Sequence, residues 1–221
     1  MHSERGSSAR AMSRFGSDEE LQYRLAHAAP GDVARGIFMN SLLDMVREFG
    51  DESLLRQCLE ESGEPRFLEF FNYPIGTFLR MAYPAAWRMG GTYGGFEEAM
   101  REMGRRASRS FYTSSAGKVL LLLARNDPLR LLSNLPSTTH AVMGEISIIS
   151  QLKRTGRSSG VLSYAHDIIP RAYNEGALSA ALEAVSARDV KVRARPLGPF
   201  ITDYEMSWAE PRGYVEVSTR E

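Results

Sequence analysis

Few residues in this chain combine the types and the spacing that catalysis or metal binding requires. The 221 residues include four histidines: His2, His27, His140 and His166. No two of them stand at the separation with which one helix presents two metal ligands. The single cysteine, Cys58, excludes both a disulfide within the chain and a zinc cluster built on cysteines. It falls on the apolar side of a predicted helix, as small buried hydrophobic residues do. The sequence therefore predicts no metal site.

Two further arrangements resemble functional motifs without matching them. Ser115-Ala116-Gly117-Lys118 resembles part of a phosphate-binding loop, but that motif requires a glycine where this chain has Tyr112 and a hydroxyl residue where it has Val119. His166 and Asp167 are the residue types of an acid–base pair, yet adjacent residues of a strand point to opposite faces of a sheet. We therefore predict no catalytic residues and do not expect an enzyme.

The aromatic side chains are more informative. Residues 67 to 96 include nine of them, and methionines are frequent in and just after this stretch. Such side chains line pockets for apolar ligands, and they equally form a plain core or anchor an interface between proteins. We expect the following residues to contact an apolar small molecule: Phe71, Tyr73, Trp87, Met103, Phe111, His140 and Tyr164.

Helices in the first half of the chain would position many of these side chains. Apolar residues recur at helical spacing from Ile37 to Phe49, and Gly50 stands where such a helix would end. Further helices are predicted near residues 51–59, 75–81 and 96–111. We expect breaks at Tyr73-Pro74 and Tyr83-Pro84, because the residue before a proline is displaced from the helical region. Paired glycines predict a flexible loop at residues 90–95.

The second half predicts an antiparallel sheet interrupted by one helix. The expected elements are a short helix (Pro128–Asn134), a hairpin (Glu145–Lys153 and Gly160–His166), a helix (Arg171–Ala187) and two closing strands (Val190–Arg195 and Thr202–Trp208). Alternation of apolar and polar residues is clearest in the closing strands. Helices followed by strands in this order predict an α+β fold, with an N-terminal helical layer packed on a C-terminal antiparallel sheet.

Composition and charge limit the possible domain organisation, binding partners and location of the protein. We expect a mobile N-terminal arm at residues 1–30, a single domain at residues 31–210 and a C-terminal tail at residues 211–221. Net charge is zero and the pI is about 6.9, so nothing predicts binding to nucleic acid. The longest apolar run, Val119–Ala124, is far shorter than the roughly 20 residues that span a bilayer. With no apolar run near the N-terminus to act as an export signal, we expect a cytoplasmic protein without a membrane span.

Several segments together resemble a known family. They are Gly36-Ile37-Phe38, Tyr73-Pro74, residues 96–105, Gly117-Lys118-Val119-Leu120, residues 174–178 and Tyr204-Glu205-Met206-Ser207-Trp208. In these the chain resembles a paralogous family of unknown function that is expanded in myxobacteria. That family is similar in fold to the heme–nitric-oxide-binding domain, to 4-vinyl-reductase-type ligand-binding domains and to the transport-particle (TRAPP) subunits. The resemblance covers roughly residues 35–209 and implies an apolar cavity between the helices and the sheet.

The resemblance also allows heme to be considered residue by residue. Heme-binding relatives carry an axial histidine before the hairpin and a Tyr-x-Ser-x-Arg motif that holds the propionates. His140 falls near the expected place of the axial ligand, and Tyr164 matches the first position of the motif. His166 and Ile168 replace its serine and arginine, so the propionates would lack their charge-assisted partner. We therefore expect no cofactor.

Two classes of function remain open. The first is a non-enzymatic sensor or ligand-binding module, in signalling or regulation, whose cavity takes an apolar small molecule. The second is a dimeric scaffold that recruits a partner protein and fills the cavity with its own side chains. We expect a homodimer formed through the helix near residues 32–49, because its apolar residues occupy more than one face. The competing interpretation is that this helix is buried within one subunit.

Overall fold

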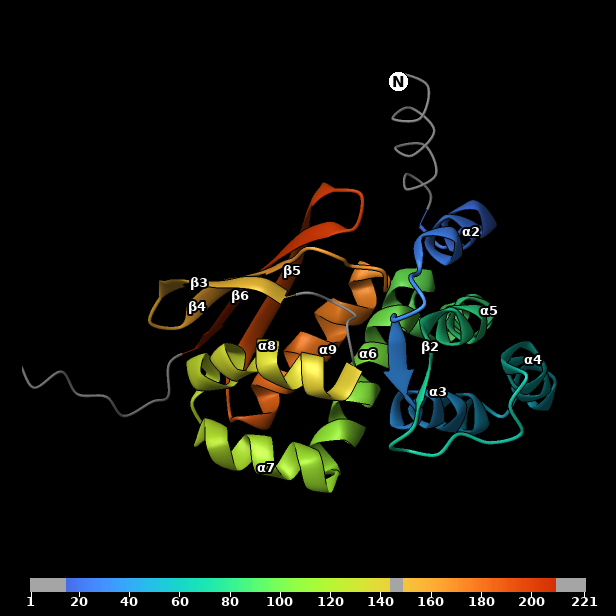
Figure 1. The fold of residues 1–221 in the computed structure, drawn as a ribbon, viewed down its shortest axis with the longest axis horizontal. Coiled ribbons are helices and arrows are strands. Elements are labelled where there is room, and N and C mark those ends of the chain that lie inside the picture. The colour runs from blue at the N-terminus through green and yellow to red at the C-terminus, as the bar shows by residue number, and fades with distance from the viewer. Residues whose placement is uncertain (1–14, 144–148, 210–221) are drawn as a thin grey trace, which may run out of the picture.

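The structure, a computed structural model, describes residues 15–143 and 149–209 (Figure 1). Side chains are described within these ranges except at residues 137–150. The elements are, in chain order, α2 (Asp18–His27), β1 (Val33–Arg35), α3 (Gly36–Phe49), α4 (Glu52–Ser62), β2 (Asn72–Pro74), α5 (Ile75–Tyr93), α6 (Phe96–Thr113), α7 (Ser115–Ala124), α8 (Pro128–Met143), β3 (Ile149–Gly156), β4 (Ser159–Tyr164), α9 (Arg171–Ala184), β5 (Arg188–Gly198) and β6 (Ile201–Ala209). The predicted α+β class is confirmed.

The main sheet has four antiparallel strands in the order β3-β4-β6-β5. The hairpin and both closing strands therefore belong to one sheet, as predicted, although residues 145–148 of the expected first strand lie outside the described residues. A second sheet pairs β1 with β2, with Ala34 opposite Tyr73. It was not predicted, because three-residue strands carry too few alternations to be seen in a sequence.

Helix α6 lies between the helical layer and the helix that covers the sheet (Figure 1). It crosses α9 at backbone contact: a Cβ atom on Gly176 would stand 1.8 Å from the Arg101 carbonyl oxygen. At the same crossing the Arg101 guanidinium lies 2.6 Å from the Glu175 carboxylate. Glu175 also accepts a hydrogen bond from the backbone N–H of Ala194 on β5. The helical layer is thereby joined to the sheet through α9.

Two helices are longer than the sequence predicted. Pro84 lies inside α5 and did not end it, whereas Pro74 does precede the first turn of that helix. The predicted break at Tyr83-Pro84 was therefore wrong: Tyr83 and its neighbours Ala82 and Ala85 are fully buried, and this packing outweighs the roughly 3 kcal/mol that an internal proline costs a helix. Gly90 is likewise helical, so the expected loop is confined to residues 94–95. Helix α8 continues through Pro136 to Met143.

The apolar residues of α3 are covered within one chain. Phe38, Met39, Leu42, Leu43, Met45 and Val46 are all buried in the helical core. The competing interpretation, a helix buried within one subunit, therefore accounts for its apolar faces. The reason given for a homodimer through this helix does not hold, and dimerisation itself stays a prediction.

The N-terminal segment differs from the mobile arm expected at residues 1–30. Residues 18–27 form helix α2, whose side chains reach the interior: Glu20 and Arg24 are each 1% exposed. The sequence contains a helical signal here, but it did not predict that this helix packs against the core. Charged residues such as Glu20 and Arg24 are rarely buried unless they are paired. Residues 1–14 and 210–221 lie outside the described residues, and with them the predicted C-terminal tail at residues 211–221.

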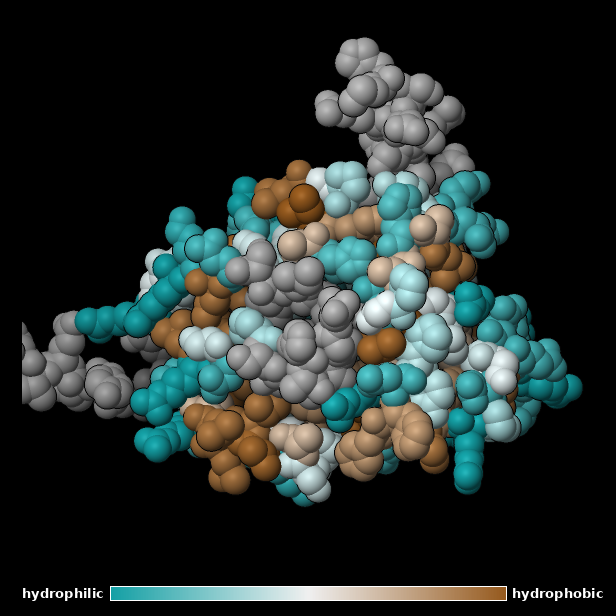
Figure 2. All heavy atoms as spheres, viewed as in Figure 1, coloured by the Kyte–Doolittle hydropathy of each residue, from teal (hydrophilic) through white to brown (hydrophobic). Residues whose placement is uncertain are grey.

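Among the described residues, no helix combines the length and the apolar character needed to cross a bilayer. The outer face of α7 is nevertheless apolar, with Val119, Leu122 and Leu123 more than half exposed. Figure 2 shows a brown, hydrophobic surface at the lower left, where Figure 1 places α7.

Candidate ligand-binding site

The residues expected to contact a ligand differ widely in burial. Met103, Phe111 and Tyr164 are buried, Tyr73 is half-buried, and Phe71 and Trp87 are about 60% exposed. Among the described side chains, none of their rings stacks on another. Phe111 packs on Phe38, Tyr164 on Tyr204, and Trp87 on Phe96. His140 lies on α8, and its side chain falls outside those described.

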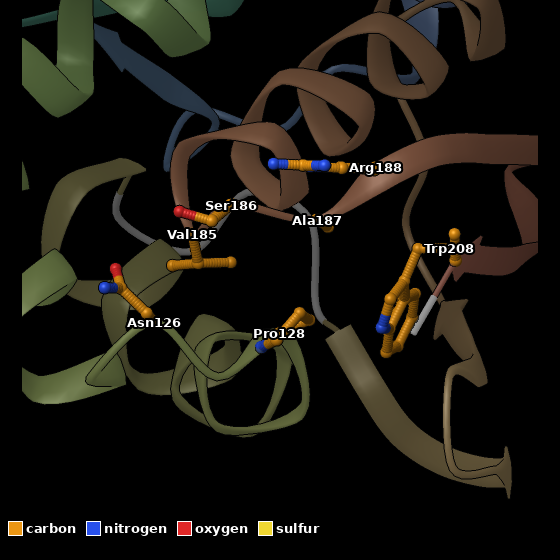
Figure 3. A pocket seen from close by; sticks show the side chains of 8 residues that line it. Asn126, Pro128, Val185, Ser186, Ala187, Arg188 and Trp208 are labelled. Carbon is orange, nitrogen blue, oxygen red and sulfur yellow. The ribbon is translucent and has the colours of Figure 1, made fainter. Parts of the chain in front are cut away.

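A hollow of about 320 Å³ opens where the helices meet the end of the sheet (Figure 3). It is lined by Asn126 and Pro128 at the turn from α7 to α8, by Val185, Ser186 and Ala187 after α9, by Arg188 at the start of β5, and by Trp208 and Ala209 at the end of β6. We refer to these eight residues as the junction pocket. Its volume lies at the small end of the range that holds small organic molecules.

One side of the junction pocket is apolar. In Figure 3 the Trp208 indole faces Pro128 and Val185 across the hollow. Val185 is fully buried and Trp208 is 8% exposed, so both are held firmly by the surrounding core. Trp208 is fixed further by its backbone N–H, which donates to the Ser158 carbonyl at 3.1 Å. A rigid aromatic ring of this kind offers a large contact area with little loss of side-chain entropy on binding.

The other side carries three polar groups: the Arg188 guanidinium, the Ser186 hydroxyl and the Asn126 amide. Figure 3 shows Arg188 extending along the upper edge, toward the side where Ser186 lies. Arg188 is exposed, and it forms no ion pair with any of the described residues. An apolar wall facing a few polar groups is the usual composition of a small-molecule site.

The backbone around the junction pocket is unusual. Five described residues other than glycine have positive φ, and two of them, Asn126 (55°) and Ser186 (65°), line this pocket. Two more, Arg125 (52°) and Asp189 (50°), directly neighbour lining residues. Left-handed backbone costs an L-residue about 1–2 kcal/mol, and glycine would avoid that cost. Four of the five strained positions therefore gather at one pocket, a pattern that is common at functional sites.

The left-handed turn after α9 is well formed despite its sequence. The N–H of Ser186 donates to the Glu183 carbonyl, and the N–H of Ala187 donates to the Leu182 carbonyl. These are the two hydrogen bonds of a glycine-type helix ending, with a serine at the left-handed position. The predicted helix to Ala187 was three residues too long, because no glycine marks this ending.

A second polar group of residues surrounds the segment that follows β4. Asp167 is buried and accepts hydrogen bonds from the Tyr204 hydroxyl at 2.8 Å and from the Asn174 amide at 2.7 Å. Burial raises the pKa of its carboxyl above the usual value, against the opposing effect of these hydrogen bonds. The Arg24 guanidinium donates to the carbonyl oxygens of Asp167 and Ile168 and lies 2.7 Å from Glu20. We call Glu20, Arg24, Asp167, Asn174 and Tyr204 the closed network.

His166 and Asp167 do not face each other, as predicted from their adjacency. His166 Nε2 lies 2.8 Å from the Asp32 carboxylate, whereas Asp167 points to Tyr204 and Asn174. Cys58 is fully buried on α4, and burial raises the pKa of its thiol to about 11. It is thus a buried hydrophobic residue, as its place on the helix indicated. The described residues contain no cluster of metal-ligating side chains.

Residues 27–209 match a protein family that is described as being of unknown function, DUF2378. The chain belongs to the DUF2378 family. No match was found among curated proteins. Among solved structures, its fold is similar to that of H-NOX domains.

Three H-NOX structures illustrate the likeness. The Fe(II) unliganded H-NOX protein from K. algicida is 10% identical, with a TM-score of 0.65, over 82% of this chain and 100% of that one. The S. oneidensis H-NOX protein in its Fe(II)NO state is 14% identical, with a TM-score of 0.63, over 80% and 99%. An oxygen-binding H-NOX domain related to soluble guanylate cyclases is 12% identical, with a TM-score of 0.58, over 80% and 96%. At such identities the likeness concerns the fold alone.

The described residues do not fit a heme in this DUF2378 protein. Ile168, at the position of the expected arginine, is fully buried and apolar, and His166 is engaged by Asp32. The nearby Arg24 is already bound to Glu20 and to two backbone carbonyls. Asp167 would bring a further carboxyl group close to the propionates, where a cation is needed. The segment therefore supplies no charge-assisted partner for a heme.

Sequence reasoning missed the junction pocket. Trp208 was predicted only as an apolar strand residue, and Arg188 and Ser186 were not singled out. The one usable signal was the run from Val185 to Asp189, which connects a helix to a strand without glycine or proline. Its left-handed backbone could not be predicted from residue types that rarely adopt it.

Proposed function

We propose that the protein is a non-enzymatic sensor or binding module that holds an apolar small molecule at the junction pocket. The observation that carries this proposal is the concentration of left-handed, non-glycine backbone around a hollow with a rigid tryptophan wall. Strain of this kind persists only where the surrounding structure enforces it, and it is frequent at ligand-binding sites. H-NOX proteins of similar fold have been solved in an Fe(II)NO-ligated state and as an oxygen complex, which agrees with a sensing role on this fold.

The experiment uses the two tryptophans of the chain. Trp87→Phe leaves Trp208 as the only tryptophan, so its fluorescence reports on the junction pocket alone. Titration with the neutral dye N-phenyl-1-naphthylamine should quench Trp208 and raise dye emission, since the two chromophores would lie in contact. Ala187→Leu should fill part of the hollow and weaken this signal. Ala116→Leu, at an exposed position on α7, is the matched control and should leave it unchanged. Equal behaviour of both leucine variants would count against the proposed site.

The proposal also requires that the protein works without heme. Protein made in heme-replete cells should show no Soret band. A Soret band that His140→Ala abolishes would overturn this part and restore the heme interpretation.

A dimeric scaffold that recruits a partner protein is the second candidate, and one observation favours it. Leu122 is 75% exposed, and Val119 and Leu123 lie on the same helical face, so α7 presents an apolar patch that lacks cover within the described part of one chain. A second copy could cover this patch, and zero net charge offers little repulsion to oppose self-association. Sedimentation should then give a dimer that Leu122→Gln converts to a monomer. A monomer at every concentration would remove this candidate.

A further inference from the structure

We propose that the junction pocket selects an apolar carboxylate, that is, a small aromatic or aliphatic molecule bearing one negative charge. The inference rests on the proposed function and specifies the chemical class of its ligand. It is carried by Arg188, whose guanidinium lies beside the apolar wall, and by the absence of a carboxylate among the lining residues.

The charge at the pocket is positive on balance. Of the eight lining residues, Arg188 alone is charged, and Asn126 and Ser186 add neutral polar groups. Among the described residues, the carboxylates nearest in sequence are engaged elsewhere or do not line the hollow. Asp127 caps α8, accepting from the N–H groups of Leu129 and Arg130, and lies 3.6 Å from the Arg130 guanidinium.

Two further carboxylates near the lining residues, Glu183 and Asp189, belong to the described residues, and neither lines the hollow. Glu183 lies 3.4 Å from Arg109, on α6. Asp189 follows Arg188 directly, at the irregular start of β5, but is not among the lining residues. A guanidinium with no ion-pair partner among the described residues is thus left beside the hollow, where its binding to a ligand would break no existing pair.

The strand pairing places the backbone of Arg188 near the tryptophan. Arg188 on β5 stands opposite Ala209 on β6, the residue after Trp208. One molecule can therefore rest its apolar part against Trp208 and Val185 and turn its acidic end toward Arg188. Guanidinium and carboxylate match in geometry and form two parallel hydrogen bonds, which a neutral amide cannot reproduce.

The number of charges argues for a carboxylate rather than a phosphate. A phosphate monoester carries nearly two negative charges at neutral pH and would leave one of them without a partner beside an apolar wall. The hollow of about 320 Å³ also suits a compact ligand of one or two rings. A cationic ligand would be repelled by Arg188.

A pair of probes of equal shape tests the charge. Calorimetry should show that 1-naphthylacetate binds the protein about tenfold more tightly than 1-naphthylacetamide, since a charge-assisted pair contributes about 1.5 kcal/mol or more. Arg188→Gln should abolish this preference while neutral N-phenyl-1-naphthylamine still binds at Trp208. Lys191→Gln, an equal loss of charge at an exposed position of the same strand, should preserve the preference.

The outcomes separate the two proposals. If the neutral dye binds at Trp208 but acid and amide bind equally, or the acid is preferred even in Arg188→Gln, the carboxylate inference is wrong and the binding module stands. If neither the dye nor the acid reaches Trp208, the junction pocket is not a binding site and both proposals fail.

Discussion

The closed network and the junction pocket lie at opposite ends of α9 and treat polar groups in opposite ways. In the closed network, Arg24 and Asp167 are buried, and each has several hydrogen-bond partners inside the protein. At the junction pocket, Arg188 is exposed and has no ion pair among the described residues, and the backbone beside it is strained. The polar groups of the closed network hold helices and strands together, whereas the polar groups of the junction pocket are available to bind a ligand.

This difference indicates which region is structural and which is suited to binding. A buried charge that is fully paired cannot bind a ligand without breaking its pairs, and breaking a buried pair costs several kcal/mol. A ligand at the junction pocket would have no such cost. The comparison therefore predicts that substitutions in the closed network lower stability strongly and leave binding intact, and that substitutions at the junction pocket change binding and have only a small effect on stability.

The largest effect is expected for Arg24→Met. This change leaves Glu20 buried without its partner and two carbonyl groups without their donor, so the free energy of unfolding should fall by about 3–5 kcal/mol. Urea unfolding measures it. The double variant Glu20→Gln and Arg24→Met should lose less than the single variant, because no unpaired charge remains. Loss of less than about 1 kcal/mol in Arg24→Met would show that α2 is not held by this pair.

Asp167→Asn should change how stability depends on pH. Burial raises the pKa of Asp167 in the folded protein, so its stabilising contribution is complete below the unfolded pKa of about 3.9 and is lost as pH rises through the folded pKa. Asparagine resembles the protonated acid and can donate to the Tyr204 hydroxyl, which then acts as an acceptor. The variant should therefore gain stability relative to wild type as pH rises from about 4 to about 8.

Urea unfolding across that range checks this expectation. Asp203→Asn is the control, because Asp203 precedes Tyr204 on β6 but is paired with the exposed Arg195. This variant should not gain stability relative to wild type as pH rises. A constant difference between Asp167→Asn and wild type would mean that Asp167 is ionised in the folded protein throughout.

The closed network and the pocket also differ in how far they could be predicted. Alternation at Val190–Arg195 and helical spacing up to Gly50 specified the sheet and α3, because local pattern and burial agree there. The burial of Arg24 could not be predicted from the sequence, because its partners include carbonyl groups more than 140 positions away in the chain. The junction pocket could not be predicted for a similar reason: its lining comes from three separate segments, and no residue type indicated the left-handed turn at Ser186.

The smallest effect, and the sharpest for the comparison, is expected for Ser186→Gly. Glycine relieves the left-handed backbone at φ 65° but adds freedom to the unfolded chain, so the net gain in unfolding free energy should be about 0.5–1 kcal/mol. The same change removes a hydroxyl from the junction pocket and should weaken 1-naphthylacetate binding several-fold. Asn126→Gly is the matched case and should gain less, because asparagine tolerates this conformation better than serine does. A gain in stability with unchanged binding would mean that the serine contributes nothing to the pocket. A loss of stability would mean that the turn is not strained, and the observation that carries the proposed function would then no longer support it.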